Sequence, residues 1–262
     1  ESGGNSMSSI MITGANEGIG YFLAEQLLED GHRVVVLDKE TEHIQDLKKI
    51  YPDALSIYLT DVRNQIVLQK AIDDAFSQLR EIDVVIHNAC RCTFDAIENT
   101  DIETYRDVLD VNYFGALRLT KSVLPYLKKQ KCGRIIYTSS GVGVTGFVNI
   151  SPYASSKGAL ESLAKCLNIE CARDQISFHI FHPPLTRTKS SQPLPIPKEF
   201  MAAPEKVGRG LAKHIFSKRF IICNSFNQKL QTMTCYAFPV KMGRLLSKMT
   251  ARYESSERLQ KI

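Results

Sequence analysis

The chain has 262 residues, of which 44% are hydrophobic and 23% are charged, and this composition can build a single domain with a full core. No apolar run approaches the roughly 20 residues that span a bilayer, and the N-terminus lacks the charged and apolar regions of a secretion signal. These features argue against a membrane-spanning or secreted protein. We expect a soluble, cytoplasmic protein in which residues 1–7 are a tag remnant or a disordered tail.

The seven cysteines are odd in number and form no Cys-x-x-Cys pair, so the sequence predicts neither a disulfide framework nor a metal site. The net charge of +5 comes entirely from residues 224–262, which contain seven basic and two acidic residues. Because this charge lies in one short segment with few aromatic residues, we do not expect a nucleic-acid partner.

A glycine-rich turn is the first motif in the chain. An apolar run predicts a strand over 9–13, residues 14–20 read Gly-Ala-Asn-Glu-Gly-Ile-Gly, and apolar residues follow at helical spacing from 22 to 28. Such a turn lets the N–H groups and positive dipole end of the helix meet a pyrophosphate, which a side chain at Gly14 or Gly18 would obstruct. The alternative is a tight turn without a ligand, which glycines also permit.

An acidic residue, Asp38, ends the second predicted strand, 33–37, about 20 residues past the glycines. Its carboxylate would accept hydrogen bonds from the adenosine ribose hydroxyls and repel a 2′-phosphate, which favours NAD over NADP. The negative charge of Glu17 also favours NAD, whereas the nearby cations Lys39 and Arg33 would favour the 2′-phosphate of NADP. The alternative for Asp38 is a solvated strand terminus.

Strands and helices alternate along the rest of the chain. Strands are expected over 55–59, 82–86, 134–137, 176–181 and 220–222, and helices over 63–79, 102–129, 153–172 and 204–217. This alternation predicts an α/β fold with a doubly wound parallel sheet of about seven strands and helices on both faces. The ligand crevice of such a sheet lies at the carboxyl ends of the strands.

The motifs of interest follow the predicted strands at that edge of the sheet. They are Asp61 and Val62, which are placed to address adenine, His87-Asn88-Ala89-Cys90, Ser139-Ser140 and His182-Pro183-Pro184. We expect His87 to be a packing residue and not a metal ligand, because no second histidine or carboxylate is spaced to join it.

Tyr153 and Lys157 lie four residues apart, so a helix would place a phenol and an ammonium group on one face. A nearby cation favours the phenolate, which lowers the pKa of a tyrosine from about 10 towards a useful range. Tyr153 would then exchange a proton with an alcohol or ketone oxygen. Alternatively, the two residues lie on a solvated helix face.

Five motifs together resemble the short-chain dehydrogenase/reductase family over about residues 8–223. They are Thr13-Gly14-Ala15-Asn16-Glu17-Gly18-Ile19-Gly20, Asn88-Ala89, Asn112, Ser140 and Tyr153-x-x-x-Lys157. The resemblance implies a Rossmann fold and four catalytic residues. Tyr153 would be the acid/base, Lys157 would lower its pKa and hold the nicotinamide ribose, Ser140 would polarise the substrate oxygen, and Asn112 would hold a water that links Lys157 to solvent.

The resemblance also implies a nicotinamide cofactor, with NAD preferred and NADP as the alternative. The residues expected to contact it are Gly14, Asn16, Glu17, Gly18, Ile19, Gly20, Asp38, Asp61, Val62, Asn88, Ala89, Tyr153, Lys157, Pro183, Thr186 and Thr188.

Three features depart from the family pattern. Cys90 stands where a glycine is usual after Asn-Ala, and residues 183–188 read Pro-Pro-Leu-Thr-Arg-Thr in place of the usual Pro-Gly. A second proline removes an N–H, so the nicotinamide carboxamide would rely on the Thr186 backbone and the Thr188 hydroxyl. Third, residues 224–262 form a basic extension with interleaved apolar residues, which would pack on the domain, on a partner subunit or on a membrane surface.

The expected substrate is a lipophilic, sterol-like or long-chain alcohol or ketone, because the residues expected to line its cleft are apolar. They are Phe94, Val144, Phe147, Val148, Ile150, Leu185, Leu194, Ile196, Phe200 and Met201, with a proline-stiffened lid over 190–197. A polar anionic substrate bound by Arg187, with Lys189 as the other nearby cation, is the alternative.

Two classes of function fit these residues. The first is an NAD(P)-dependent oxidoreductase that interconverts a secondary alcohol and a ketone. The second is a non-catalytic nucleotide-binding sensor or scaffold that recruits a membrane or protein partner through the basic extension. The family resemblance also implies a homodimer or homotetramer in which the helix over 102–129 and the Tyr153 helix pair across a two-fold axis.

Overall fold

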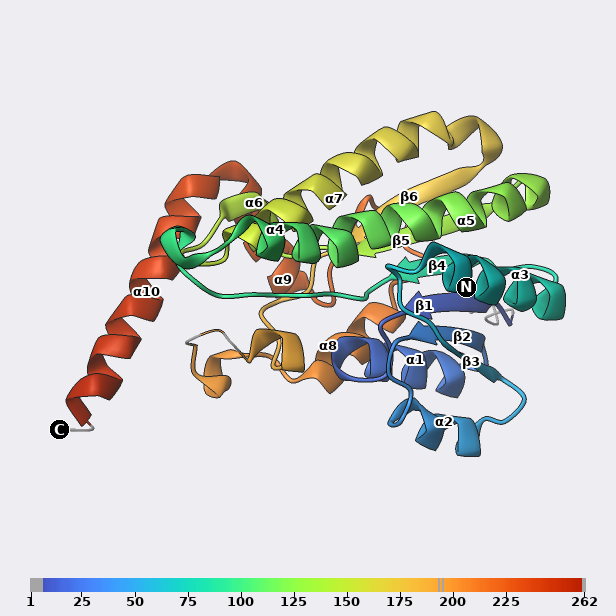
Figure 1. The fold of residues 1–262 in the computed structure, drawn as a ribbon, viewed down its shortest axis with the longest axis horizontal. Coiled ribbons are helices and arrows are strands. Elements are labelled where there is room, and N and C mark those ends of the chain that lie inside the picture. The colour runs from blue at the N-terminus through green and yellow to red at the C-terminus, as the bar shows by residue number, and fades with distance from the viewer. Residues whose placement is uncertain (1–6, 193, 195, 261–262) are drawn as a thin grey trace.

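The computed structural model describes residues 7–260 except 193 and 195, with side chains described through residue 251 (Figure 1). Of the expected N-terminal tail, all but Met7 lies outside the described residues. Pro193 and Pro195 of the expected lid also lie outside them.

Seven parallel strands form one sheet in the order β3-β2-β1-β4-β5-β6-β7. The strands are β1 Ser9–Thr13, β2 Arg33–Asp38, β3 Leu55–Leu59, β4 Val84–His87, β5 Gly133–Thr138, β6 Ile176–Phe181 and β7 Ile221–Ile222. This confirms the predicted doubly wound parallel sheet. The strand order reverses between β1 and β4, and a crevice opens at such a switch point.

Helices cover both faces of the sheet (Figure 1). They are α1 Gly18–Glu29, α2 Ile44–Ile50, α3 Gln65–Leu79, α4 Ile102–Leu109, α5 Gly115–Gln130, α6 Val142–Thr145, α7 Ser151–Glu170, α8 Pro204–Ala212, α9 Phe226–Ala237 and α10 Pro239–Gln260. The helix predicted over 102–129 contains a π turn, Asp110–Phe114, between α4 and α5. Helix α8 ends at Ala212, five residues earlier than the prediction of 217.

Helix α2 was not predicted, because its stabilising contact is not local. Asn16, in the glycine-rich turn, accepts hydrogen bonds at Oδ1 from the backbone N–H groups of His43 (2.9 Å) and Ile44 (3.1 Å). A residue 27 positions earlier therefore satisfies N–H groups that a helix N-terminus leaves without partners. Helix α3, by contrast, has a local cap, since Asn64 Oδ1 accepts from Ile66 and Val67.

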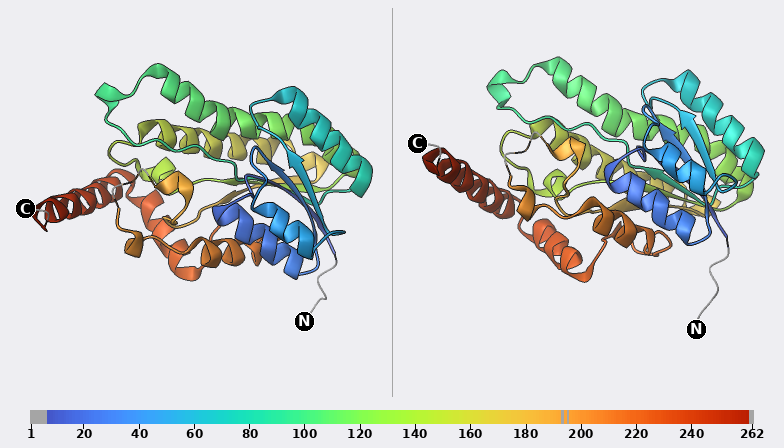
Figure 2. Two further views of the ribbon diagram at one scale, coloured as in Figure 1. Left: turned by 60° about the horizontal axis from the view of Figure 1, so that its bottom comes forward. Right: turned by 90° about the horizontal axis from the view of Figure 1, so that it is seen from below.

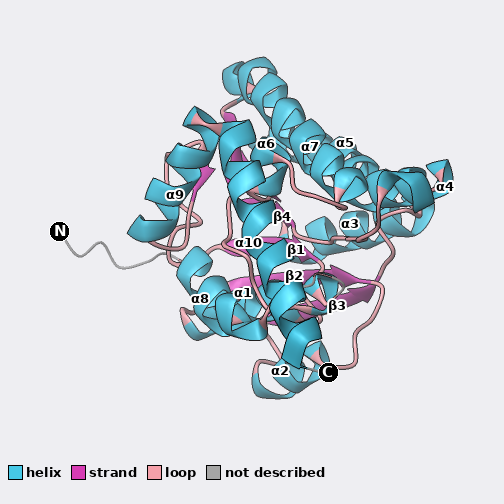
Figure 3. Cartoon of the chain, turned by 90° about the vertical axis from the view of Figure 1, so that its left-hand side faces the viewer, coloured by secondary structure: helices cyan, strands magenta, loops and turns pink. Residues whose placement is uncertain are grey.

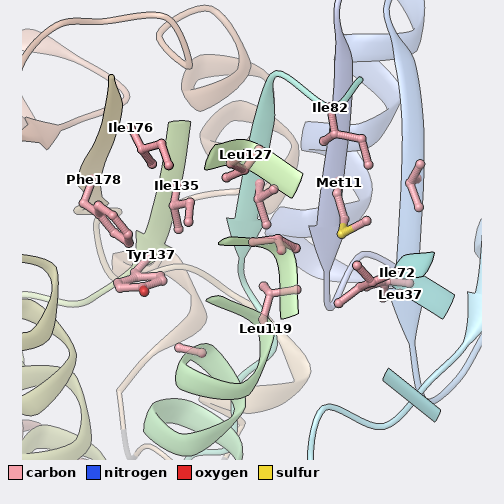
Figure 4. Packing of buried hydrophobic residues seen from close by; sticks show 14 of the residues in the cluster. Met11, Leu37, Ile72, Ile82, Leu119, Leu127, Ile135, Tyr137, Ile176 and Phe178 are labelled. Atoms are coloured by element: carbon pink, nitrogen blue, oxygen red, sulfur yellow. The ribbon is translucent and has the colours of Figure 1, made fainter. Parts of the chain in front are cut away.

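The core consists of two apolar clusters, one on each face of the sheet. Figure 4 shows the cluster between the sheet and helices α3, α5 and α7, which includes Met11, Leu37, Ile72, Ile82, Leu119, Leu127, Ile135, Tyr137, Ile176 and Phe178. The other cluster lies under α1, α2 and α8. Because both faces are covered, strands such as Val34–Leu37 are apolar without interruption.

Helices α9 and α10 form the C-terminal extension, and α10 projects from the body of the molecule (Figure 2). Viewed along the long axis of the molecule, α10 lies in front of the sheet (Figure 3). Its first turns pack on α6: a Cβ atom at Gly243 would lie 2.4 Å from the Thr145 carbonyl oxygen, and the Val148 N–H donates to Ser247 Oγ (3.2 Å). Within the described ranges, no helix is both long and apolar enough to cross a membrane.

Candidate functional site

A cavity of about 390 Å³ opens at the carboxyl ends of the strands. It is lined by most of the predicted site residues: Gly14, Asn16, Glu17, Gly18, Ile19, Asp38, Asp61, Val62, Asn88, Ala89, Ser140, Tyr153, Lys157, Pro183, Thr186 and Thr188. Gly20 and Asn112 were also predicted, but they lie behind the cavity wall and do not line it. The lining also includes residues that were not predicted, among them Thr60, Arg91, Cys92, Val111 and Val142.

The glycine-rich turn has no room for side chains at two of its positions. Gly14 has a φ of +71°, and a Cβ atom there would lie 2.5 Å from the Ala89 Cα atom. A Cβ atom at Gly20 would lie 2.1 Å from the Gly14 carbonyl oxygen, which accepts a hydrogen bond from Asn88 Nδ2 (2.6 Å). Gly20 therefore allows close packing of the turn, while Gly14 leaves its backbone exposed to a ligand.

Thr13 and His87 hold the ends of β1 and β4 together. Thr13 Oγ1 accepts hydrogen bonds from the N–H groups of Asn88 and Ala89 (3.2 Å each) and lies 3.1 Å from His87 Nδ1. Burial lowers the pKa of His87 to about 3, so its imidazole is neutral. Across residues 7–260, apart from the gaps at 193 and 195, no cluster of three or more histidine, cysteine or acidic residues is placed to bind a metal.

Asp38 lies at the end of β2 with its carboxylate against the glycine-rich turn. It accepts hydrogen bonds from the backbone N–H groups of Asn16 (2.8 Å) and Glu40 (3.2 Å). Burial raises the pKa of Asp38, and these hydrogen bonds act in the opposite direction. The carboxylate is thus held in a fixed orientation at the edge of the cavity.

Lys189 was expected beside the substrate but lies near Asp38. Its Nζ is 3.2 Å from Glu40 and 3.8 Å from Glu17, and both carboxylates line the cavity. Lys39 also pairs with Glu40, at 3.5 Å. Sequence spacing could not predict these ion pairs, because the 310 turn Lys189–Ser191 lies far from Glu17 and Glu40 along the chain.

Tyr153 lines the cavity, and Lys157, one helical turn later in α7, is fully buried. Lys157 Nζ lies 5.5 Å from the centre of the Tyr153 ring and donates a hydrogen bond to the Thr138 carbonyl oxygen (2.7 Å). Burial raises the pKa of Tyr153, as do the neighbouring thiols of Cys90 and Cys92. A hydrogen bond with Ser140 acts in the opposite direction and lowers the pKa of Tyr153.

Asn112 lies in the π turn between α4 and α5 and is fully buried. Its Nδ2 donates to the Arg91 carbonyl oxygen (2.9 Å) and to Ser156 Oγ (2.8 Å), and its Oδ1 accepts from the Arg91 N–H (2.8 Å). Both amide hydrogens are therefore used, and a bound water would have only the second lone pair of Oδ1. Asn112 fixes the segment after β4 against α7, close to Tyr153.

The Pro-Pro segment after β6 forms a compact turn. Thr186 Oγ1 donates to the Pro184 carbonyl oxygen (2.7 Å), and Ser191 Oγ donates to the Thr186 carbonyl oxygen (2.8 Å). Thr188 caps the 310 turn and places its side chain against Gly18, where a Cβ atom would lie 3.1 Å from Thr188 Cγ2. These bonds hold Thr186 and Thr188 at the cavity wall in the absence of the usual glycine.

Three of the ten apolar residues expected in the substrate cleft line this cavity. Ile150, Leu185 and Leu194 line the cavity, whereas Phe200 does not and is 74% exposed. The predicted residues Phe94, Val144, Phe147, Val148, Ile196 and Met201 also lie outside the cavity lining. Arg187 is exposed and outside the lining as well.

Comparison with known proteins connects this cavity to a family. A family model described as short chain dehydrogenase matches residues 8–198. The chain is 30% identical to a fatty acyl-CoA reductase of Acinetobacter baylyi over 72% of this chain and 65% of the relative. It is 33% identical to a mitochondrial D-beta-hydroxybutyrate dehydrogenase of Mus musculus over 62% of this chain and 49% of the relative. The chain thus spans about half to two thirds of the length of these curated relatives.

Solved structures show the same fold. A short-chain dehydrogenase from Streptomyces avermitilis superposes with a TM-score of 0.78 and 22% identity over 97% of this chain and 99% of that one. A 3-ketoacyl-(acyl-carrier-protein) reductase from Brucella melitensis, complexed with NADH, superposes with a TM-score of 0.74 and 20% identity over 83% of this chain and 94% of that one. At these identities the likeness concerns the fold of the chain.

Proposed function

Because this chain belongs to the short-chain dehydrogenase family, we propose that it is an NAD(P)-dependent oxidoreductase that interconverts a secondary alcohol and a ketone. One observation carries the proposal: Ser140, Tyr153 and Lys157 meet at the same cavity as the glycine-rich turn. A hydride acceptor and a proton-transfer group must both reach one substrate for this chemistry.

The residues present fit a dinucleotide. The φ of Gly14 and the close approach of Ala89 support a cradle of backbone for the pyrophosphate, and the carboxylate of Asp38 would accept hydrogen bonds from a ribose. Asp61 and Val62 would contact the adenine. The residues that would hold the rest of the dinucleotide are Asn16, Glu17, Gly18, Ile19, Asn88, Ala89, Lys157, Pro183, Thr186 and Thr188. The nicotinamide, when bound, accepts or donates a hydride at the substrate carbon.

In oxidation, Tyr153 Oη would take the proton of the substrate hydroxyl, and in reduction it would return a proton to the carbonyl oxygen. Ser140 would donate a hydrogen bond to the same oxygen and stabilise the charge that develops there. Since burial raises the pKa of Tyr153, its ionisation depends on positive charge and hydrogen bonds arranged around it. Lys157 and Ser140 are the groups on this chain that provide them.

We propose NAD as the preferred form. Asp38 and Glu17 would repel a 2′-phosphate, and the cations nearby, Lys39 and Lys189, pair with Glu40 or Glu17. We also propose a lipophilic substrate, because Ile150, Leu185 and Leu194 give one part of the cavity an apolar wall.

The substitution Tyr153→Phe tests the proposed chemistry. We expect turnover of hydrophobic secondary alcohols with NAD to fall by about 10²- to 10⁴-fold, the usual contribution of a general acid or base. NADH affinity, measured by fluorescence titration, should stay the same. Tyr126→Phe is the matched control, because Tyr126 donates to Asp73 on the protein surface and its loss should not alter turnover. Equal turnover by Tyr153→Phe and wild type would refute the proton-transfer role.

We propose further that residues 8–223 form the catalytic domain and that the extension contacts an anionic membrane surface. In α9 the apolar side chains of Phe226, Leu230 and Met233 are exposed (77%, 59% and 59%), while Gln228 and Thr232 are buried. From residue 224 to 251 the chain has four basic and no acidic residues. Exposed apolar groups beside charge of one sign suit an anionic lipid surface, whereas a second copy would bring like charges together.

Vesicle sedimentation tests this contact. We expect binding to vesicles that contain phosphatidylglycerol and little binding to phosphatidylcholine alone. The double variant Lys241→Glu/Lys248→Glu should bind about tenfold or more weakly, since each basic residue near an anionic surface contributes about 1 kcal/mol. Lys70→Glu/Lys121→Glu, with the same change of charge on α3 and α5, is the control. Self-association without vesicles would indicate a second copy as the partner.

We propose a homodimer or homotetramer formed through α4, α5 and α7. Apolar side chains are exposed at Ile102 in α4, at Phe114 in the π turn between α4 and α5, and at Ile169 in α7, and self-association would cover them. Light scattering that gives the mass of a monomer would contradict this assembly.

A further inference from the structure

Glu161 is a buried carboxylate at the centre of a hydrogen-bond network. It lies in α7, one helical turn after Lys157, and is 4% exposed. Its Oε1 accepts a hydrogen bond from Ser139 Oγ (2.7 Å) and lies 2.9 Å from His182 Nε2. Its Oε2 accepts from the Tyr236 hydroxyl (2.5 Å). His182 Nδ1 is buried and has no hydrogen-bond partner among the described residues, so Nε2 is the ring nitrogen that bonds to Glu161.

These bonds keep the carboxylate ionised inside the protein. Burial alone would raise the pKa of Glu161, but hydrogen bonds from His182, Tyr236 and Ser139 outweigh it and lower the pKa below its ordinary value. Burial and the adjacent carboxylate raise the pKa of Tyr236, so this hydroxyl remains a donor. A buried charge without such partners would be strongly unfavourable, and each donor therefore constrains where the carboxylate lies.

The donors come from three different segments, and two of these segments continue directly into the cavity wall. Ser139 precedes Ser140 at the end of β5, and His182 precedes Pro183 at the end of β6. The third donor, Tyr236, belongs to α9 of the C-terminal extension. One carboxylate thus connects the extension to the segments that carry the proposed substrate-polarising serine and nicotinamide contact.

We propose that Tyr236 is a positioning residue for the reaction: through Glu161 it fixes the Ser139-Ser140 and His182-Pro183 segments around the reacting atoms. This inference rests on the proposed oxidoreductase function. It assigns to the C-terminal extension a part in building the active site, in addition to any contact with a surface.

The surroundings of Tyr236 support this role. The buried residues of α9 are Gln228, Thr232 and Cys235. Thr232 Oγ1 accepts a hydrogen bond from the thiol of Cys223, which follows β7 in the body of the molecule (3.7 Å). The ring of Tyr236 lies 5.8 Å from the His182 ring, at 53°. The ionisable groups that face Glu161 are Tyr236 and His182, and the thiols of Cys223 and Cys235 lie next to the Tyr236 hydroxyl.

The substitution Tyr236→Phe removes one hydroxyl and keeps the ring. We expect kcat to fall by about tenfold, because a small displacement of Ser140 is enough to reduce turnover, while NADH affinity stays the same. Loss of the hydrogen bond raises the pKa of Glu161, so protonation disrupts the network at higher pH, and the acid limb of the kcat profile should move to higher pH. Tyr126→Phe, which also removes a hydrogen bond from a tyrosine hydroxyl to a carboxylate, should leave kcat and the acid limb unchanged.

Hydrogen–deuterium exchange provides a readout that does not need turnover. Backbone amides of residues 138–142 and of Phe181 and His182 should exchange faster in Tyr236→Phe than in wild type and Tyr126→Phe. Faster exchange with unchanged kcat and pH profile would overturn the positioning role, as would unchanged exchange. If the wild-type protein turned over no alcohol or ketone, the proposed oxidoreductase function would fail, and the positioning role would fail with it even if the exchange data showed that Tyr236 holds the two segments.

Discussion

At one end of the cavity, where β1, β2 and β4 terminate, the backbone itself forms the surface, whereas at the other end side chains from two connecting segments form it. The first end contains the glycine-rich turn, with Gly14 packed against Ala89 and Asp38 held by two N–H groups. The second end contains Ile150, Leu185 and Leu194, from segments that are partly exposed.

This difference implies that the two ends of the cavity tolerate amino-acid substitutions differently. A surface made of closely packed backbone cannot adjust to an added atom, because its neighbours are main-chain atoms on adjacent strands. A surface made of side chains can change shape by substitution without disturbing the sheet. At the first end, the proposed nucleotide site, a single added methyl group should therefore reduce nucleotide affinity. At the second end, the proposed substrate site, substrate affinity should fall only in proportion to the apolar area removed.

The substitution Gly14→Ala should give the largest effect of this comparison. A methyl group would lie 2.5 Å from the Ala89 Cα atom at a φ of +71°. We expect NADH affinity to fall by about 100-fold, and the free energy of unfolding to fall by about 1–3 kcal/mol, measured by urea denaturation.

Gly31→Ala is the matched control for that change. Gly31 has a φ of +83°, but nothing lies within 4 Å of the added Cβ atom. It should lose about 1 kcal/mol of stability from backbone strain and keep its NADH affinity. If both variants bound NADH equally, the close approach at Gly14 would not shape the nucleotide site.

The substitution Asp38→Ala should have a smaller effect on the same end of the cavity. Removal of the carboxylate removes its repulsion of a 2′-phosphate, and we expect the ratio of NADPH to NADH affinity to rise by about tenfold. Asp46→Ala, an exposed aspartate paired with Lys49, is the control. An unchanged ratio in Asp38→Ala would show that another residue discriminates between the cofactors.

The substitution Leu185→Ala should have the smallest effect, at the substrate end. We expect the KM for a lipophilic alcohol to rise by about fivefold, because a partly exposed leucine loses only part of its transfer free energy. NADH affinity should not change. Phe200→Ala is the control, since Phe200 lies outside the cavity. A larger effect at Phe200 than at Leu185 would mean that the lipophilic substrate binds elsewhere.

Sequence reasoning succeeded where a few neighbouring residues determine the local geometry. The turn from Gly14 to Gly20 and the pair Tyr153 and Lys157 are short motifs, and the structure places Gly14, Tyr153 and Lys157 at the same cavity. The alternation of apolar runs was enough to predict the parallel sheet, which is confirmed. Each of these features depends on spacing along the chain.

The remaining features depend on contacts between distant residues. Asn16 caps α2 from 27 positions away, and Lys189 pairs with Glu17 and Glu40 across the cavity. Tyr236 reaches Glu161 from a helix 75 positions later. Apolar character alone could not distinguish Leu185, which lines the cavity, from Phe200, which does not. No local pattern encodes such pairings, because they follow from how loops fold over the sheet.

The close contact at Gly243 has a geometric consequence for α10. This residue rests directly on the carbonyl oxygens of Thr145 and Gly146, and the helix continues from there to Gln260, a length of about 25 Å at 1.5 Å per residue. A tilt of about 10° at that contact would move the far end by about 4 Å. A single methyl group at position 243 would therefore change the direction of the projecting part of α10. The small size of Gly243 thus determines the orientation of this helix.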